Sequence, residues 1–378
     1  MSDSESNKEL DSSRILELSA NKDVDGLITA LSQVENCNLI KHIIYELGEL
    51  KNSKATEALL KKVVNLGKIA IRQAAIRAIG SIGDGRAVDT LIFVMVNDKD
   101  CRVTAAETLG MMKAEKAVPA MKLLLDYQHH ADDEVYEQQG LESILEALGK
   151  IASEEAMVCL IEKLLTPQLS LAEKVSQVLA EIGKQAVPLL ISALDNKEVK
   201  TKRMVIKVLG NITDKECTQP LLKILEDESE DSETKEEVAY ALAKIKDPGA
   251  VEPLITVALR HADFRDGDYS ISVCAVRALG NIGDRRAVEP LISIINDKSN
   301  PMRIRGCAAD TLGKIGGNRA VERLIKVLNN YREDEWVKDC AAWALLQLDE
   351  EKIAYPLLKY LKKKKDVINM NNPIGDIR

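Results

Sequence analysis

The sequence predicts an all-α fold, a right-handed α-solenoid (an α–α superhelix) of about ten helical hairpins. Apolar residues make up 46% of the 378 residues but aromatic residues only 3%. This balance suits many thin layers of Ala, Leu, Ile and Val better than one large globular core. A phrase of the type Leu-Gly-x-Ile recurs along nearly the whole chain, and a second apolar phrase with helical spacing follows it.

The recurring tetrad, whose second position we call the anchor, sets the period of the repeat. Neighbouring anchors are separated by 30 to 39 residues, which gives a unit of about 33 residues repeated ten times. Weaker copies centre on Ala180, Ala243 and Leu346. Clear copies lie at residues 47–50, 79–82, 109–112, 148–151, 209–212, 279–282 and 312–315.

Each unit contains two phrases, and both are expected to form helices. In the second phrase, apolar residues such as Val288, Leu291 and Ile295 recur at helical spacing. A glycine inside a helix costs about 1 kcal/mol relative to alanine, so the anchor glycines predict a neighbouring helix at close range. Helix ends with an Asp cap for the next helix are expected at Gly83-Asp84, Thr213-Asp214, Lys246-Asp247 and Gly283-Asp284.

The two ends of the stack differ from its middle. A short helix near residues 13–19 precedes the first unit, and a half unit at 353–361 follows the last and is expected to cap the stack. We therefore expect a single solenoid domain from residue 13 to residue 361. Residues 1–12 are expected to be disordered, as is the basic tail 362–378.

The repeat unit resembles a known family. The phrase Arg-Ala-Val-Glu-Pro-Leu-Ile at 286–292, then a polar turn, then Arg-x-Cys/Ala-Ala-x-x-x-Leu-Gly-x-Ile-Gly, is similar to the HEAT repeat of the phycobilisome-lyase type. The resemblance covers roughly residues 23–361. It implies a helical solenoid, in a group that includes phycobilin lyases, deoxyhypusine hydroxylase and scaffolds. That hydroxylase binds di-iron through His-Glu dipeptides, and this sequence contains none.

Charge and cysteine usage narrow the partners. The formal net charge of −8 disfavours a general nucleic-acid binder, which needs a basic face. No apolar run reaches the length of a membrane helix, and the first residues lack the features of a signal peptide, so we expect a cytoplasmic protein. The seven cysteines form no Cys-x-x-Cys pair, which predicts reduced thiols. We expect no cofactor and no metal, and a monomer.

The polar face of the tetrad helix is the first candidate binding surface. In HEAT-like stacks this helix lines the concave groove, and here its residue three positions before the anchor varies from unit to unit. An ordinary solvated face is the alternative. The groove-binding candidates are Arg77, Arg203, Lys207, Tyr240, Arg277 and Trp343.

Two long turns, at residues 126–136 and 260–269, are the second candidate. Both contain His-Ala-Asp, and together they hold three of the four histidines. Tolerated, solvent-exposed insertions are the preferred interpretation of these turns, followed by partner-binding loops and then by a metal site. The loop-binding candidates are His130, Asp132, His261, Asp263, Phe264 and Tyr269.

Cys274, Cys307 and Cys340 recur at intervals of 33 residues, each six residues before its anchor. A stair of metal-binding thiolates is one interpretation. Buried cysteines acting as small apolar residues are the preferred one, because stacked helices stand about 10 Å apart whereas Zn–S bonds are about 2.3 Å.

The sequence contains no catalytic constellation, so a non-enzymatic function is favoured. The leading hypothesis is a scaffold or adaptor that binds a protein or peptide through the concave groove or through acidic turns such as 226–233. Tyr331, Trp336 and Trp343 would anchor such a partner if they face outward. A chromophore-attachment factor similar to phycobilin lyases is the alternative, and a metal-dependent oxidoreductase related to the hydroxylase is disfavoured.

Overall fold

The computed structural model describes residues 12–65, 67–126, 134–164, 169–195, 198–260, 270–348 and 353–370. The regular elements of these ranges are all helices, which confirms the predicted all-α solenoid. The helices group into two compact units, the N-terminal unit Met1–Ile182 and the C-terminal unit Gly183–Arg378. That residues 13–361 behave as one domain stays a prediction.

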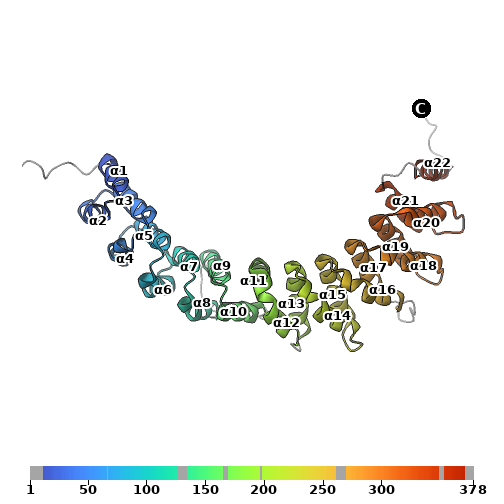
Figure 1. Cartoon of the computed structure of the whole chain (residues 1–378), viewed down its shortest axis with the longest axis horizontal. Coiled ribbons are helices and arrows are strands. Elements are labelled where there is room, and N and C mark those ends of the chain that lie inside the picture. Colours follow the sequence, from blue (N-terminus) through green and yellow to red (C-terminus); the bar gives the residue numbers. More distant parts are fainter. Residues whose placement is uncertain are drawn as a thin grey trace, which may run out of the picture. The chain divides into compact units, whose positions relative to one another are not determined.

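In the N-terminal unit, a first helix and an anchor helix, which carries the tetrad, alternate in two layers (Figure 1). The predicted entry helix is present as α1. The elements are α1 (Ser12–Ala20), α2 (Val24–Gln33), α3 (Cys37–Glu49), α4 (Thr56–Val64), α5 (Ile69–Ile82), α6 (Val88–Asn97), α7 (Arg102–Met111), α8 (Val118–Asp126), α9 (Glu134–Ile151), α10 (Glu154–Leu164) and α11 (Leu169–Ile182). The anchor helices are α3, α5, α7, α9 and α11.

The C-terminal unit repeats the pattern, with anchor helices α13, α15, α17, α19 and α21 (Figure 1). Its elements are α12 (Val187–Ala193), α13 (Val199–Ile212), α14 (Thr218–Glu226), α15 (Ser232–Ile245), α16 (Val251–Arg260), α17 (Ser270–Ile282), α18 (Val288–Asn296), α19 (Met302–Ile315), α20 (Asn318–Asn329), α21 (Glu335–Leu346) and α22 (Ala354–Met370).

The last helix extends into the segment expected to be a tail. α22 runs to Met370, whereas the disordered tail was expected to begin at Lys362. One reason lies in its contacts with α21: Lys364 forms an ion pair with Asp339, and the Tyr360 hydroxyl donates a 2.8 Å hydrogen bond to the same carboxylate. Lys364 lies beyond residue 361, where the capping helix was expected to end, so its ion pair holds the added part of α22 against α21.

Each anchor glycine with a clear tetrad is a point of close helix packing, as its place in the repeat predicts. A Cβ atom added there would come within 2.5 to 3.1 Å of a residue on the next anchor helix. For Gly110 the nearest atom is the Cα of Ala147, at 2.8 Å. The contact residue always lies two positions before the next anchor, and the set is Ala78, Thr108, Ala147, Val178, Ala241, Thr311 and Ala344.

The predicted caps are also present, although each acts on a short 3-10 turn that precedes the following α-helix. Asp84 accepts a hydrogen bond from the backbone N–H of Arg86 at 3.0 Å, at the start of the turn Gly85–Ala87. Equivalent bonds are made in three other repeats by Asp214, Asp247 and Asp284. These bonds satisfy backbone donors that have no partner within the helix.

Removing the cap at Asp84 is expected to destabilise the N-terminal unit. Its carboxylate also accepts a 2.8 Å hydrogen bond from the buried Thr56 hydroxyl, and hydrogen bonds from Arg86 hold the pKa of Asp84 well below its usual range. We expect Asp84→Ala to lower the free energy of unfolding by about 1–2 kcal/mol in urea titrations. The control Asp89→Ala removes an exposed pair with Lys116 and an exposed carboxylate in the first turn of α6, and should cost less than Asp84→Ala, at most about 1 kcal/mol. Equal losses would contradict this role.

Charged side chains link successive repeats. Near the start of an anchor helix, Arg72 pairs with Asp98 and Arg305 pairs with Glu333, each a carboxylate of the next repeat. Both arginines are buried, at 8% exposure. These contacts are structural and lie away from the outward face.

Candidate functional site

The outward face of the anchor helices is a continuous set of positions within each unit. Residues seven and three positions before the anchor and one position after it follow one side of each helix, and we call these positions the outward stripe. At the middle position, all ten side chains are exposed or half-buried. They are Tyr45, Arg77, Glu107, Glu146, Gln177, Lys207, Tyr240, Arg277, Asp310 and Trp343.

In the C-terminal unit, the outward stripe combines basic and aromatic side chains. Tyr240 is 44% exposed and Trp343 is 66% exposed. Lys207 and Arg277 are exposed on the anchor helices α13 and α17, which flank α15 and its Tyr240. These four groove candidates therefore lie at an accessible surface of one unit.

Arg203 has a different environment from the other groove candidates. Its guanidinium pairs with Asp231 at 2.7 Å and with Glu233, and it donates a 3.1 Å hydrogen bond to the Thr234 hydroxyl. All three partners belong to the next repeat. Arg203 therefore links its own repeat to the next one, as Arg72 and Arg305 do.

The acidic turn at 226–233 provides carboxylates for these contacts between repeats. Lys202 pairs with Glu230 at 2.6 Å, beside the Arg203 pairs with Asp231 and Glu233. Three of the acidic side chains in this run therefore contact cations of the preceding anchor helix. The contacts favour the outward stripe over this turn as a surface for a partner.

Tyr240 and Arg277 belong to one small cluster with two thiols. Arg277 interacts with Tyr240 and with Cys307, and Tyr240 interacts with Cys274. Burial raises the pKa of Cys274 and of Cys307, as it does for Cys340, whose pKa reaches about 11. Such thiols are weak nucleophiles at neutral pH. In the described ranges, no group of three His, Cys, Asp or Glu side chains is arranged to bind a metal ion.

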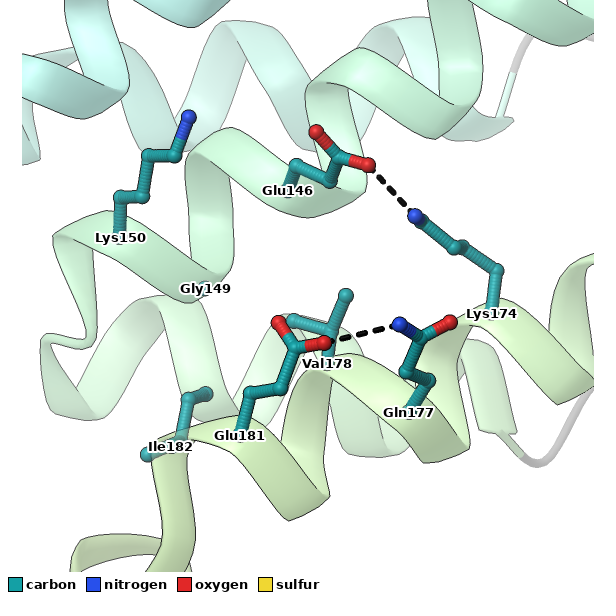
Figure 2. A pocket seen from close by; sticks show the side chains of 8 residues that line it. All are labelled: Glu146, Gly149, Lys150, Lys174, Gln177, Val178, Glu181 and Ile182. Carbon is teal, nitrogen blue, oxygen red and sulfur yellow. Dashed lines mark hydrogen bonds and ion pairs between the residues drawn. The ribbon is translucent and has the colours of Figure 1, made fainter.

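The outward stripe of the N-terminal unit contains a polar hollow of about 410 Å³ between α9 and α11 (Figure 2). Two polar contacts span this hollow or run along its wall. Lys174 pairs with Glu146 at 2.5 Å, and the Gln177 amide donates a 2.8 Å hydrogen bond to Glu181. The bond to Glu146 raises the pKa of Lys174. Arg77 is exposed on α5 of the same unit but does not line this hollow.

A second hollow, of about 580 Å³, lies between α20, α21 and α22. Tyr331, Lys338 and Tyr360 line it, and burial raises the pKa of Tyr360 well above its usual range. Sequence reasoning missed this hollow because α22 forms part of its wall. Tyr331 is 75% exposed, whereas Trp336 is 44% exposed and its ring packs against Gly306.

Sequence reasoning also missed Lys244 and Lys314, which occupy the last position of the outward stripe. Both residues are the third residue of a tetrad and directly follow an anchor, as Lys314 follows Gly313, and this position in the repeat could have identified them. The six loop-binding candidates, His130, Asp132, His261, Asp263, Phe264 and Tyr269, lie outside the described residues.

Comparisons with known proteins agree with the repeat architecture. HEAT repeats match residues 24–100, 69–137, 187–267 and 259–333. Phycocyanobilin lyase subunit alpha of Nostoc sp. (strain PCC 7120) is 28% identical over 202 residues, which are 49% of this chain and 73% of that protein. These two findings confirm the resemblance to HEAT repeats of the phycobilisome-lyase type.

Two solved structures are similar to this chain to different degrees. The first is the complex of CpcE and CpcF of phycocyanin lyase from Nostoc sp. The match covers 75% of this chain and 98% of the matched chain, with 22% identity and a TM-score of 0.35. The second is Kap121p bound to Nup53p. The match covers 96% of this chain and 45% of the matched chain, with 13% identity and a TM-score of 0.54. At this identity, the likeness to Kap121p shows the fold alone. None of the helices in the described ranges has both the length and the apolar character to cross a membrane.

Proposed function

The chain belongs to the HEAT-repeat family, and on this premise we propose that it is a non-enzymatic scaffold that binds a protein or peptide partner. The binding surface is the outward stripe of the C-terminal unit. The observation that carries this proposal is the exposure of Lys207, Tyr240, Arg277 and Trp343 on successive or nearby anchor helices of one unit.

The residue types on this surface are suited to protein recognition. Tyr, Trp and Arg are enriched among the residues that contribute most to protein–protein affinity. A tyrosine or tryptophan buries a large apolar area when covered, while losing little conformational freedom. The helices that carry the two aromatic residues pack closely against anchor glycines of the preceding helices: α15 against Gly210 and α21 against Gly313. Because these helices are already fixed, the backbone needs little ordering when a partner binds.

The chemistry of the other polar groups supports binding more than catalysis. The two thiols near Tyr240 have raised pKa values, and Glu146 and Lys174 of the N-terminal hollow form an ion pair with one another. A nucleophile or general base at neutral pH needs the opposite conditions, namely a lowered thiol pKa or a base free to accept a proton.

The proposal is tested by removing the aromatic side chains from the stripe. We expect Tyr240→Ala/Trp343→Ala to weaken retention of the native partner by tenfold or more when immobilised full-length protein is exposed to extract of the source cells and retained proteins are quantified. The control Phe93→Ala/Tyr355→Ala removes two exposed aromatic side chains away from the stripe. Phe93 is 61% exposed on the first helix α6, and Tyr355 is 76% exposed on α22. This control should retain the partner. Equal retention by both double variants would contradict the proposal.

Chromophore attachment is the second candidate function, favoured by one observation: the 28% identity to a phycocyanobilin lyase subunit. This candidate predicts that the purified protein binds a bilin and changes its absorption spectrum. Titration with phycocyanobilin tests it directly. An unchanged spectrum would remove this candidate and leave the scaffold proposal standing.

A further inference from the structure

The charges of the outward stripe in the C-terminal unit are not balanced. The stripe carries the cations Arg203, Lys207, Lys244, Arg277 and Lys314 and the anions Glu236, Asp310 and Asp339. Several of these groups are neutralised within the chain. Arg203 is held by Asp231 and Glu233, Lys314 pairs with Asp310 at 3.0 Å, and Asp339 is bound by Lys364.

Three cations of the stripe have no carboxylate partner in the described part of the chain: Lys207, Lys244 and Arg277. The Lys244 ammonium donates a 2.8 Å hydrogen bond to the neutral side-chain oxygen of Asn211, which keeps its charge uncompensated. Arg277 interacts with the neutral groups of Tyr240 and Cys307. Together with Tyr240, these residues form what we call the basic–aromatic patch.

The patch crosses three successive anchor helices, α13, α15 and α17, and Trp343 lies two anchor helices further on, in α21 (Figure 1). Packed helices are separated by about 8–10 Å, and an extended peptide advances about 3.3 Å per residue. A peptide that crosses the helices therefore passes one helix in about three residues. About six residues separate Lys207 from Arg277 along such a peptide, and about six more reach Trp343.

We infer that the partner segment recognised by the C-terminal unit is an extended, acidic peptide. This inference rests on the proposed function and names its ligand class. Carboxylates of the peptide lie opposite Lys207, Lys244 and Arg277, an apolar side chain covers the Tyr240 ring, and a second apolar side chain about six residues beyond the acidic run covers Trp343. Charge complementarity supplies selection against basic segments, because like charges brought together at an interface are strongly unfavourable.

Nucleic acid is the other polyanion that such a patch would attract. A chain with a net charge of −8 repels it over longer distances. Within the described outward stripe of this unit, three cations are uncompensated, so few counterions would be released from phosphates. The acidic peptide is therefore the favoured ligand, and an oligonucleotide serves as a competing probe.

The test uses full-length protein and a phage-displayed library of random 18-residue peptides. Enriched peptides are synthesised with a fluorescein label, and their affinity is measured by fluorescence anisotropy. The expected result is an excess of Asp and Glu over Lys and Arg in the enriched peptides. Lys207→Glu/Arg277→Glu should weaken their binding at least tenfold. The control Lys223→Glu/Lys326→Glu makes the same charge change at exposed lysines of the first helices α14 and α20, and should change affinity less than twofold.

The possible failures are distinguishable. Enriched peptides without acidic excess, peptides insensitive to Lys207→Glu/Arg277→Glu, or tighter binding of an 18-residue poly-dT probe would overturn the acidic-peptide inference. The proposed scaffold function fails separately if no peptide is enriched, or if enriched peptides bind Tyr240→Ala/Trp343→Ala as tightly as they bind the unchanged protein. Equal thermal midpoints of the variants exclude misfolding as the cause of any loss.

Discussion

Substituting Gly110 by valine is expected to lower the free energy of unfolding of the N-terminal unit by about 3 kcal/mol or more. The added Cβ would lie 2.8 Å from the backbone Cα of Ala147 and 3.1 Å from its Cβ. A backbone atom cannot move aside as the end of a side chain can, so α7 and α9 must separate. Every side chain packed between these two helices would lose contact.

Urea unfolding followed by circular dichroism measures this loss, and hydrogen–deuterium exchange locates it in α7 and α9. Gly85→Val is the matched control, because a Cβ added at Gly85 meets nothing within 4 Å. Arg285 stands at the equivalent position of another repeat, which shows that a larger residue is accommodated there. If the two variants were equally stable, close helix approach would not explain the anchor glycines.

The second large effect is expected at Glu333, whose side chain is 1% exposed and pairs with both Lys298 and Arg305. Glu333→Gln keeps the shape of the side chain but leaves the buried Arg305 cation without its counter-charge. Losing one partner of a buried ion pair typically costs about 3–5 kcal/mol. Both tryptophans belong to the C-terminal unit, so their fluorescence during urea unfolding reports on this loss. Glu289→Gln breaks an exposed pair with Arg319 and should cost at most about 1 kcal/mol.

The effect of Glu333→Gln is expected to depend on pH. Burial by itself would raise the pKa of Glu333, but the hydrogen bond from Lys298 and the charge of Arg305 outweigh it and lower the pKa. A carboxylate whose pKa is lowered by folding stabilises the folded state fully at pH values above its pKa in the unfolded chain, about 4.3. This stabilisation is lost as the pH falls through the pKa that the group has in the folded protein. The difference in stability between the unchanged protein and Glu333→Gln should therefore be largest near neutral pH and shrink below about pH 4. A constant difference would contradict the ion pair.

The sequence was sufficient to predict the repeat, because its signals are local and recur. A cap such as Asp84 acts within a few residues of its helix. An anchor glycine such as Gly110 contacts the next repeat, but it recurs at the same place in each clear copy of the tetrad, and this repetition makes it visible without structural information. The outward stripe was predictable for the same reason, since helical periodicity alone places Tyr240 and Trp343 on the polar face of their helices.

The roles of individual charged residues were not predictable from the sequence. Arg203 and Lys207 both stand on the polar side of α13, but the carboxylates that bind Arg203 lie 28 and 30 residues further along the chain. Which cation they reach depends on how the turn before α15 folds over α13. The length of α22 was missed similarly, because its contacts with Asp339 join residues 21 and 25 positions apart.

Site-specific photo-crosslinking tests the binding surface most directly. A photoreactive amino acid is placed in the full-length protein at position 343 or 240, on the outward stripe, or at the control position 355, on α22. The expected result is cross-linking of the same partner from positions 343 and 240, with little or none from position 355. Cross-linking that is as strong from position 355, or absent from both stripe positions while the partner remains bound, would contradict binding at the outward stripe.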